Sequence, residues 1–336
     1  MQGNTMLPGK NLDVLAIGEA MVEFNQQPAA AAAPRSYLAG FGGDTSNCAI
    51  AAARMGARSA YLTQIGDDVF GDDLLALWRR EGVDTRGVNR LAGAQTGLYF
   101  VTHGSDGHRF SYRRAGSAAS RIGPASIPRG LVESARWLHC SGISQAISTS
   151  ACDAVFEAIA RARAAGTCVS YDLNFRASLW PAPRALAMAR ATLGSCDLFF
   201  PSVDEIAALT GLSRSEDIVR WSHDQGAKTV ALKLGAAGCM VSDAAGARQV
   251  APFQVQPVDA TGAGDCYAGA LLARLCAGDD GSAIHGLPLP TSRPEGPVQP
   301  TGRGSNQCAA LSASAAAVAQ RLDALLDALG HLALAL

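Results

Sequence analysis

The sequence contains little charge and almost no lysine. Charged residues make up 17% of the 336 positions, and the formal net charge at pH 7 is −1. Lysine occurs only at positions 10, 228 and 233, so arginine carries nearly all of the positive charge. A chain this close to neutrality predicts no basic surface for nucleic acid or for an anionic membrane, and we expect neither as a partner.

Motifs of paired cysteines are also missing. The nine cysteines are scattered and form no CxxC. An odd number without a pattern argues against a disulfide framework or a zinc site and for reduced thiols, so we expect a cytoplasmic location. The first ten residues hold one basic residue and no apolar core, and we expect no signal peptide. The apolar C-terminal run is broken by Arg321, Asp323 and Asp327, which indicates an amphipathic helix and not a membrane span.

Hydrophobic segments, in contrast, recur along the chain. They contribute to a hydrophobic content of 48%, which supports a sizeable core in one large α/β domain with an appendage, or in two domains. Short apolar runs predict strands at 13–17, 60–65, 137–141, 167–172, 197–200 and 228–234. Helical patterns fall between several of them, at 47–55, 70–81 and 150–165, and Thr45 or Ser46 is expected to cap the first. This alternation predicts βαβ units and a mainly parallel sheet.

A polar, glycine-rich turn at 259–265 opens onto an apolar run. Gly262 and Gly264 allow the backbone to approach a ligand closely. Together with Ala263 they would lie at a helix N-terminus, where unpaired amides suit an anion. Asp265 follows in the same turn, and a carboxylate beside an anion cradle is what phosphoryl transfer to a hydroxyl needs. The alternative is a turn whose aspartate only caps the helix.

Polar residues also follow several predicted strands. Glu19 comes after the first strand, at the edge where open α/β sheets bind ligands, although a solvated loop carboxylate is an equal alternative. Asp172, Asn174 and Arg176 cluster after a later strand, and the planar fork of the arginine suits a carboxylate or phosphate. These positions predict a ligand site at one edge of the sheet.

A strand pair interrupts the alternation. Residues 96–102 and 109–113 alternate in polarity on either side of an Asp-Gly turn at 106–107, which predicts a hairpin. Because the hairpin stands between α/β units, we interpret it as an insertion outside the main sheet.

The turn at 259–265 resembles the second signature of the PfkB (ribokinase-like) carbohydrate kinases, D-T-x-G-A-G-D, with Ala260 in place of the usual Thr. The spacing of Asn47, Gly56 and Gly66 resembles the first signature. The resemblance runs over about 13–278. It implies a ribokinase-like three-layer α/β/α sandwich with a mainly parallel central sheet. It also implies a small β-lid over the sugar, from parts of 21–40 and 95–113, through which two copies often form a homo-oligomer.

Within the family, the segments GEAMVEFN, GGDTSN, YRRAGSAAS and DLNFRASLW are similar to 2-dehydro-3-deoxygluconate (KDG) kinases. That similarity implies transfer of phosphate from ATP to the primary hydroxyl of KDG, with Asp265 as the base and residues 262–264 as the anion hole. It implies that the sugar acid is held by Gly43, Asp44, Asn47, Tyr99, Tyr112, Arg114 and Arg176. It places ATP against Lys233, Gly235, Gly238, Gly262 and Gly264. Magnesium would be held indirectly by Glu205, since Ser202 replaces the usual Asn.

The alternatives within the family are fructokinase and 2-deoxy-5-keto-gluconate kinase, and outside it a catalytically weak sugar-acid-binding protein. Ribokinase is disfavoured, because a neutral pentose gives no reason for paired arginines, whereas a carboxylate does.

The C-terminal part departs from the family pattern. Residues 278–306 contain six glycines and five prolines. Because proline costs a helix interior about 3 kcal/mol and glycine about 1, no regular helix is expected there. We therefore predict a loose tail at 1–11, a kinase domain at 12–278, an irregular segment at 279–306 and a helix at 307–336. The family has helices that close the adenine side here, so we expect an incomplete adenine pocket.

Overall fold

The computed structural model describes residues 9–28, 34–104, 107–252 and 262–278. Its main sheet consists of β1 Leu12–Ile17, β4 Ser59–Gly66, β5 Asp84–Leu91, β8 Ala135–Ser141, β9 Cys168–Asp172, β10 Leu198–Phe200, β11 Thr229–Lys233, β12 Cys239–Asp243 and β13 Gly246–Val250. The strand order is β13-β12-β11-β10-β9-β8-β1-β4-β5. Pairing is parallel from β5 to β11, and only β12 and β13 run antiparallel to their neighbours. The prediction of a mainly parallel sheet is confirmed.

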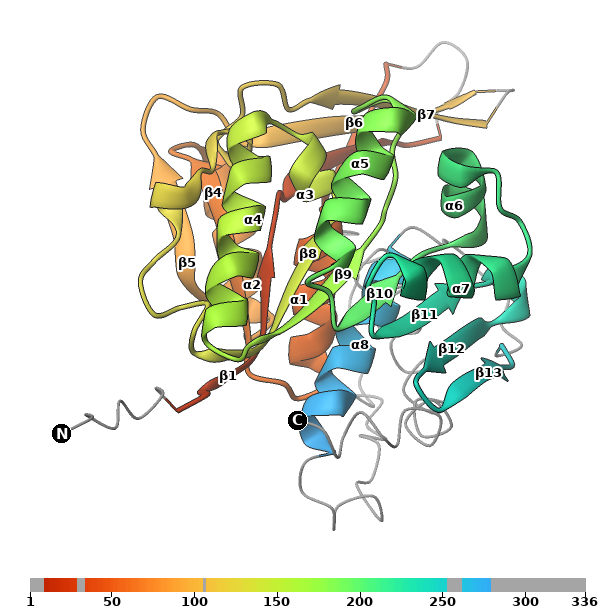
Figure 1. The fold of residues 1–336 in the computed structure, drawn as a ribbon. Helices are drawn as coiled ribbons and strands as arrows, with labels where there is room; N and C mark the ends of the chain where they lie inside the picture. Colours follow the sequence, from red (N-terminus) through yellow and green to blue (C-terminus); the bar gives the residue numbers. More distant parts are fainter. Residues whose placement is uncertain (1–8, 29–33, 105–106, 253–261, 279–336) are drawn as a thin grey trace, which may run out of the picture.

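Helices cover both faces of this sheet (Figure 1). One face carries α1 Asp44–Arg54, α2 Val69–Arg80 and α8 Ala263–Ala277, and the other α3 Gly142–Ala146, α4 Thr149–Ala164, α5 Ala182–Leu193, α6 Val203–Thr210 and α7 Ser215–Asp224. Successive residues of a strand point to opposite faces. In β1, Val14 therefore packs in the core with α1 and α8, while Leu15 packs in the core with α4 and α5. The three-layer prediction is confirmed.

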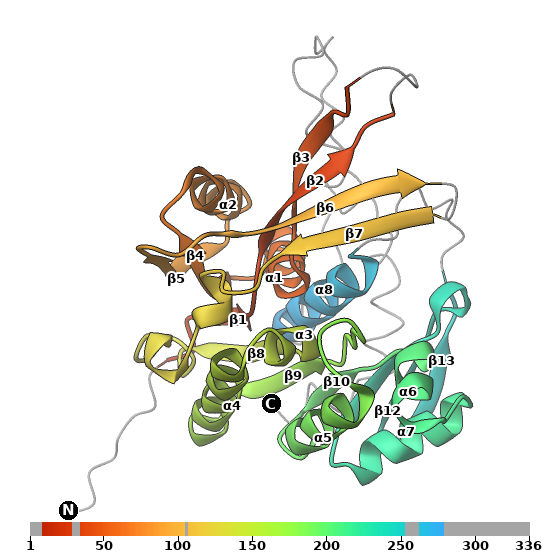
Figure 2. The same ribbon diagram turned by 90° about the horizontal axis from the view of Figure 1, so that it is seen from above.

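A second, four-stranded sheet lies outside the main one (Figure 2). Its strands are β2 Met21–Gln26, β3 Tyr37–Gly42, β6 Gly97–Gly104 and β7 Gly107–Arg113, in the order β3-β2-β6-β7. Strands β2 and β6 run parallel, and the two outer strands pair antiparallel with them. The predicted hairpin is thus β6–β7, although Asp106 of its turn lies outside the described residues.

The predicted cap of the first helix was wrong. Helix α1 begins at Asp44, and its N-cap is Gly43, whose φ of 135° suits glycine. Thr45 and Ser46 lie inside the first turn, where their hydroxyls bond core side chains and not helix amides. The hydroxyl of Thr45 is 3.1 Å from that of Tyr61, and the Ser46 hydroxyl accepts from the Trp78 indole at 2.8 Å.

Several predictions fall on residues that the structure does not describe. The irregular segment 279–306 and the helix at 307–336 lie outside the described residues, and so do residues 1–8 of the expected tail. Among the helices described, none has the length and apolar character needed to cross a membrane.

Candidate active site

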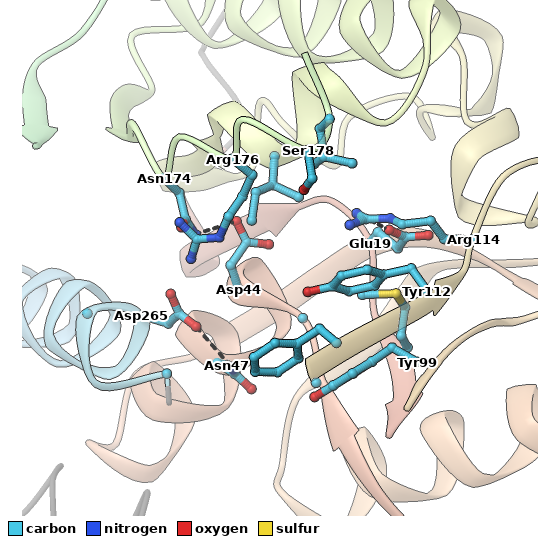
Figure 3. A pocket seen from close by; sticks show the side chains of 18 of the residues that line it. Glu19, Asp44, Asn47, Tyr99, Tyr112, Arg114, Asn174, Arg176, Ser178 and Asp265 are labelled. Carbon is cyan, nitrogen blue, oxygen red and sulfur yellow. Dashed lines mark hydrogen bonds and ion pairs between the residues drawn. The ribbon is translucent and has the colours of Figure 1, made fainter. Parts of the chain in front are cut away.

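A cavity of about 880 Å³ lies between the second sheet and the carboxyl ends of the main-sheet strands. Nearly all of the predicted site residues line it: Gly43, Asp44, Asn47, Tyr99, Tyr112, Arg114, Arg176, Glu205, Lys233, Gly262, Ala263, Gly264 and Asp265. They come from both sheets and from α1, α6 and α8, so the fold brings distant segments together (Figure 3). A cavity of this size fits a small-molecule substrate.

Residues 262–265 of the glycine-rich turn form one end of the cavity. Helix α8 begins directly after Gly262, whose φ of 75° lies in the left-handed region that glycine adopts without strain. Gly262 accepts the first intrahelical hydrogen bond, from the amide of Cys266 at 2.9 Å. The amides of Ala263, Gly264 and Asp265 precede this bond and have no partner inside the helix, so the helix terminus is present where it was predicted, and anion binding by it remains a prediction.

Asp265 lies in the first turn of α8 and is half-buried. Burial raises its pKa to about 7, and the negative charge of Asp44 contributes to the same shift. The Asn47 amide opposes it by donating a hydrogen bond of 2.9 Å to Asp265 Oδ2. A carboxyl group with a pKa near neutrality suits general base catalysis.

A network of polar contacts links the ends of β9 and β11 to α1. Lys233 Nζ donates to both carboxylate oxygens of Asp172 at 2.8 Å. Asp172 also accepts from the backbone of Asn174 at 3.1 Å, and the Asn174 amide donates to Asp44 at 3.0 Å. Asn174 has a φ of 38°, an uncommon conformation of the kind found at functional sites. Burial lowers the pKa of Lys233, but the charges of Asp172 and Glu205 outweigh it, and the net pKa is raised.

Glu205 has a structural role that its sequence position did not reveal. It forms a capping box with Ser202 at the start of α6, where its carboxylate accepts from the Ser202 amide at 3.0 Å. Its carboxylate is also 3.9 Å from the Arg176 guanidinium. Burial raises the pKa of Glu205. Within the described ranges, no group of three His, Cys, Asp or Glu side chains could hold a metal ion.

Arg114 and the tyrosines form the opposite end of the cavity (Figure 3). Arg114 follows β7 and makes an ion pair with Glu19, which is only 1% exposed. The Arg114 guanidinium lies 5.5 Å from the centre of the Tyr112 ring, and Tyr112 stacks on Tyr99 with ring centres 5.7 Å apart. The Tyr99 hydroxyl donates to the buried carboxylate of Glu23. Arg114 therefore has a carboxylate partner already, which the sequence did not indicate.

The structure does not bring Gly235 and Gly238 to the cavity lining. They flank the short turn between β11 and β12, where Gly238 has a φ of 91° and a Cβ would lie 2.2 Å from the carbonyl oxygen of Val250. The turn itself favours glycine at both positions, because both have a positive φ. Contact of either residue with ATP remains a prediction. The lining also includes apolar residues that sequence reasoning missed: Met21, Phe41, Phe110, Ile143 and Leu179.

Residues 11–319 match the pfkB family of carbohydrate kinases, so the match extends beyond position 278, where we expected the resemblance to end. The 2-dehydro-3-deoxygluconokinase of Thermoproteus tenax is 34% identical over 281 residues, covering 80% of this chain and 83% of the relative. A probable fructokinase-3 of Arabidopsis thaliana is 35% identical over 279 residues, covering 81% of this chain and 79% of the relative.

Solved structures show the same fold. A PfkB protein from Polaromonas sp. JS666 superposes with a TM-score of 0.74 at 34% identity, covering 80% of this chain and 90% of that one. A putative ribokinase II from E. coli, in complex with ATP and Mg²⁺, gives a TM-score of 0.72 at 27% identity, covering 79% and 86%. The sequence match, the layered fold and the lined cavity agree, and the chain belongs to the pfkB family of carbohydrate kinases.

Proposed function

We propose that this kinase transfers the γ-phosphoryl group of ATP to the primary hydroxyl of 2-dehydro-3-deoxy-D-gluconate, giving the 6-phosphate. The observation that carries the proposal is the layout of the cavity. Asp265 lies at one end, and Arg114 lies at the other, with Arg176 also in the lining (Figure 3). KDG is a chain with a carboxylate at one end and a primary hydroxyl at the other, which suits a cavity with Asp265 at one end and Arg114 at the other.

The chemistry follows from the residues at the α8 end. Asp265 accepts the proton of the sugar hydroxyl, whose oxygen forms a bond to the γ-phosphorus while the bond to the β-phosphate oxygen breaks and ADP leaves. The amides at Gly262–Gly264 stabilise the charge on the transferred group. Lys233 is close to this turn, since a Cβ on Gly264 would lie 3.5 Å from its ammonium. Lys233 thus adds a positive charge beside the same anion site.

Magnesium fits this site together with ATP. Mg²⁺ usually binds through one or two carboxylates, phosphate oxygens and water, and it requires no all-protein cage. Glu205 lines the cavity but has one carboxylate oxygen committed to its capping box. We propose that it reaches the ion through water, and that the bound ion neutralises phosphate charge.

Fructokinase is the second candidate. The relatives named as KDG kinase and as fructokinase are 34% and 35% identical, so identity does not choose between the two substrates. One observation favours a neutral sugar: Glu19 already balances the charge of Arg114. The arginine that favours the acid is Arg176, whose side chain is 51% exposed and lies 3.9 Å from the Glu205 carboxylate.

A coupled ADP-release assay with KDG, fructose and ribose tests the proposal. We expect the highest kcat/KM with KDG. A higher value with fructose would show that the enzyme is a fructokinase. If none of the three sugars is phosphorylated, the protein is better explained as a sugar-acid-binding protein without useful activity. The same assay with 2-deoxy-5-keto-gluconate separates the two sugar acids.

We also propose that the enzyme is cytoplasmic and that two copies contact each other through the second sheet. The eight described cysteines are free, which suits a reducing compartment. Strand β7 is an outer strand with every residue exposed, and Phe110 on it is 49% exposed. Light scattering tests the contact: Phe110→Glu should reduce the measured mass, and an unchanged mass would rule the contact out.

A further inference from the structure

We propose that Glu19 determines how strongly the cavity prefers a charged over a neutral sugar, because it balances the charge of Arg114. The inference builds on the proposed role of the cavity as the sugar site. It gives different tasks to the two arginines: Arg176 supplies the net charge that attracts a carboxylate, and Arg114 supplies hydrogen-bond donors that suit any sugar oxygen.

The first support is the burial of the pair. Glu19 lies in the loop between β1 and β2, and its ion pair with Arg114 is almost fully enclosed, with exposed side-chain fractions of 1% and 13%. Ser117 donates a hydrogen bond of 3.0 Å to Glu19 Oε1, which fixes the carboxylate. The Tyr112 ring packs against the guanidinium. Glu19 is so close to Arg114 that its negative charge cancels most of the field of the guanidinium at the cavity. Because the pair is enclosed, salt screens this interaction little.

The second support is that Arg114 retains free donors. Arg114 Nε is buried and makes no hydrogen bond to any residue that the structure describes. A buried donor without a partner is costly, so a small rotation of the Arg114 side chain that turns this donor toward a ligand oxygen gains a hydrogen bond. Arg114 also lines the cavity. It is therefore built to hold an oxygen while it contributes little net charge.

Arg176 is more exposed than Arg114 and less closely paired with a carboxylate. It follows β9 on the other wall of the cavity, and its only described hydrogen bond goes to the backbone carbonyl of Phe175 at 3.0 Å. The carboxylate of Glu205 is 3.9 Å away, beyond hydrogen-bonding distance. With its side chain half exposed, Arg176 is the less neutralised of the two cations.

The Glu19→Gln variant tests the proposal. Gln has nearly the same shape but lacks the charge: its single carbonyl oxygen can accept from Arg114 while its amide group donates to the Ser117 hydroxyl oxygen. We expect the ratio of kcat/KM for KDG to kcat/KM for fructose to rise roughly tenfold, because a unit charge a few ångströms away is worth at least one pKa unit of interaction. An unchanged or lower ratio would overturn the proposal.

Two variants distinguish an electrostatic effect of Glu19 on this ratio from a structural one. Ser117→Ala removes the support of the carboxylate but keeps both charges, and Glu19→Asp keeps the charge on a shorter side chain. Both should leave the ratio within about twofold of the wild type, even if absolute rates fall. Because both sugars are measured on one preparation, misfolded protein cancels in the ratio. A rise with Ser117→Ala equal to that with Glu19→Gln would show a structural effect and contradict the proposal.

The outcome is distinguishable from a failure of the proposed function. If the wild type phosphorylates fructose but not KDG, the KDG proposal fails, and KDG is then used as a competitive inhibitor of fructose phosphorylation. Glu19→Gln should lower its inhibition constant roughly tenfold by the same electrostatic argument. An unchanged inhibition constant would refute the role of Glu19 in this case too.

Discussion

Asn47 Nδ2 donates a hydrogen bond of 2.9 Å to Asp265 Oδ2, a contact between residues 218 positions apart in the chain. It joins the first turn of α1 to the first turn of α8. The two signatures that the sequence separates so widely thus meet at one carboxylate. The hydrogen bond orients Asp265 and favours its charged form, against the burial that raises its pKa.

The pH dependence of turnover should report Asp265. Its pKa is raised to about 7, and only the ionised carboxylate can accept the hydroxyl proton. We therefore expect kcat/KM to rise with pH, by about tenfold per unit below pH 7, and to level off above it. A profile that is already flat at pH 5 would show that Asp265 is not the titrating base.

Removing the Asn47 amide should move that profile. The hydrogen bond lowers the pKa of Asp265, so Asn47→Ala should raise it and shift the midpoint of kcat/KM to higher pH. At a pH well above both midpoints the variant should recover part of its activity. A reduced rate with an unmoved midpoint would mean that Asn47 only positions other groups.

Lys233 and Asp172 should depend on each other for stability. Lys233→Met leaves the Asp172 carboxylate buried without its cation, which should lower the free energy of unfolding by about 3–5 kcal/mol. The double variant with Asp172→Asn should recover most of this loss in a denaturant titration. If Lys233 also acts on phosphate, the recovered protein remains inactive. Full activity of the double variant would exclude that role.

Arg176 should contribute mainly to the use of a sugar acid. Arg176→Leu should reduce kcat/KM for KDG by about tenfold or more, the worth of one charge-assisted contact, and should affect fructose far less. Arg220 provides a matched control, since it is an exposed arginine on α7 that lies outside the cavity lining. Equal losses on both sugars would indicate that Arg176 binds phosphate or stabilises the structure, and does not recognise the sugar carboxylate.

The parts of the fold that the sequence predicts are those with local causes. The run at 13–17 is apolar apart from Asp13 because β1 is buried on both faces, and it could be recognised from those residues alone. Gly262 was recognised from the glycine-rich turn, where glycine allows a close approach of the backbone to a ligand, and the structure adds that its left-handed conformation favours glycine. By contrast, β5 and β13 are polar edge strands without an apolar run, and they were not predicted.

The parts that the sequence does not predict depend on which distant residues meet. Arg114 was expected to hold the sugar acid, and no residue near it in the sequence indicates its ion pair with Glu19, 95 positions away. Glu205 was given a metal role from its place in a motif, but packing at the start of α6 also makes it half of a capping box. Which side chains form such ion pairs and hydrogen bonds depends on the tertiary structure, which brings distant residues together.

Steady-state turnover of Asp265→Asn tests the central claim most directly. Asn is isosteric, and we expect the variant to fold and bind the sugar like the wild type, as checked by thermal unfolding and by calorimetry. Its kcat with ATP and the preferred sugar should fall by about 10²–10⁴-fold, the usual worth of a positioned base. Cys266→Ser, the neighbouring change in the same turn, should retain most of the turnover. Wild-type turnover by Asp265→Asn would contradict the account of this cavity as the active site with Asp265 as its base.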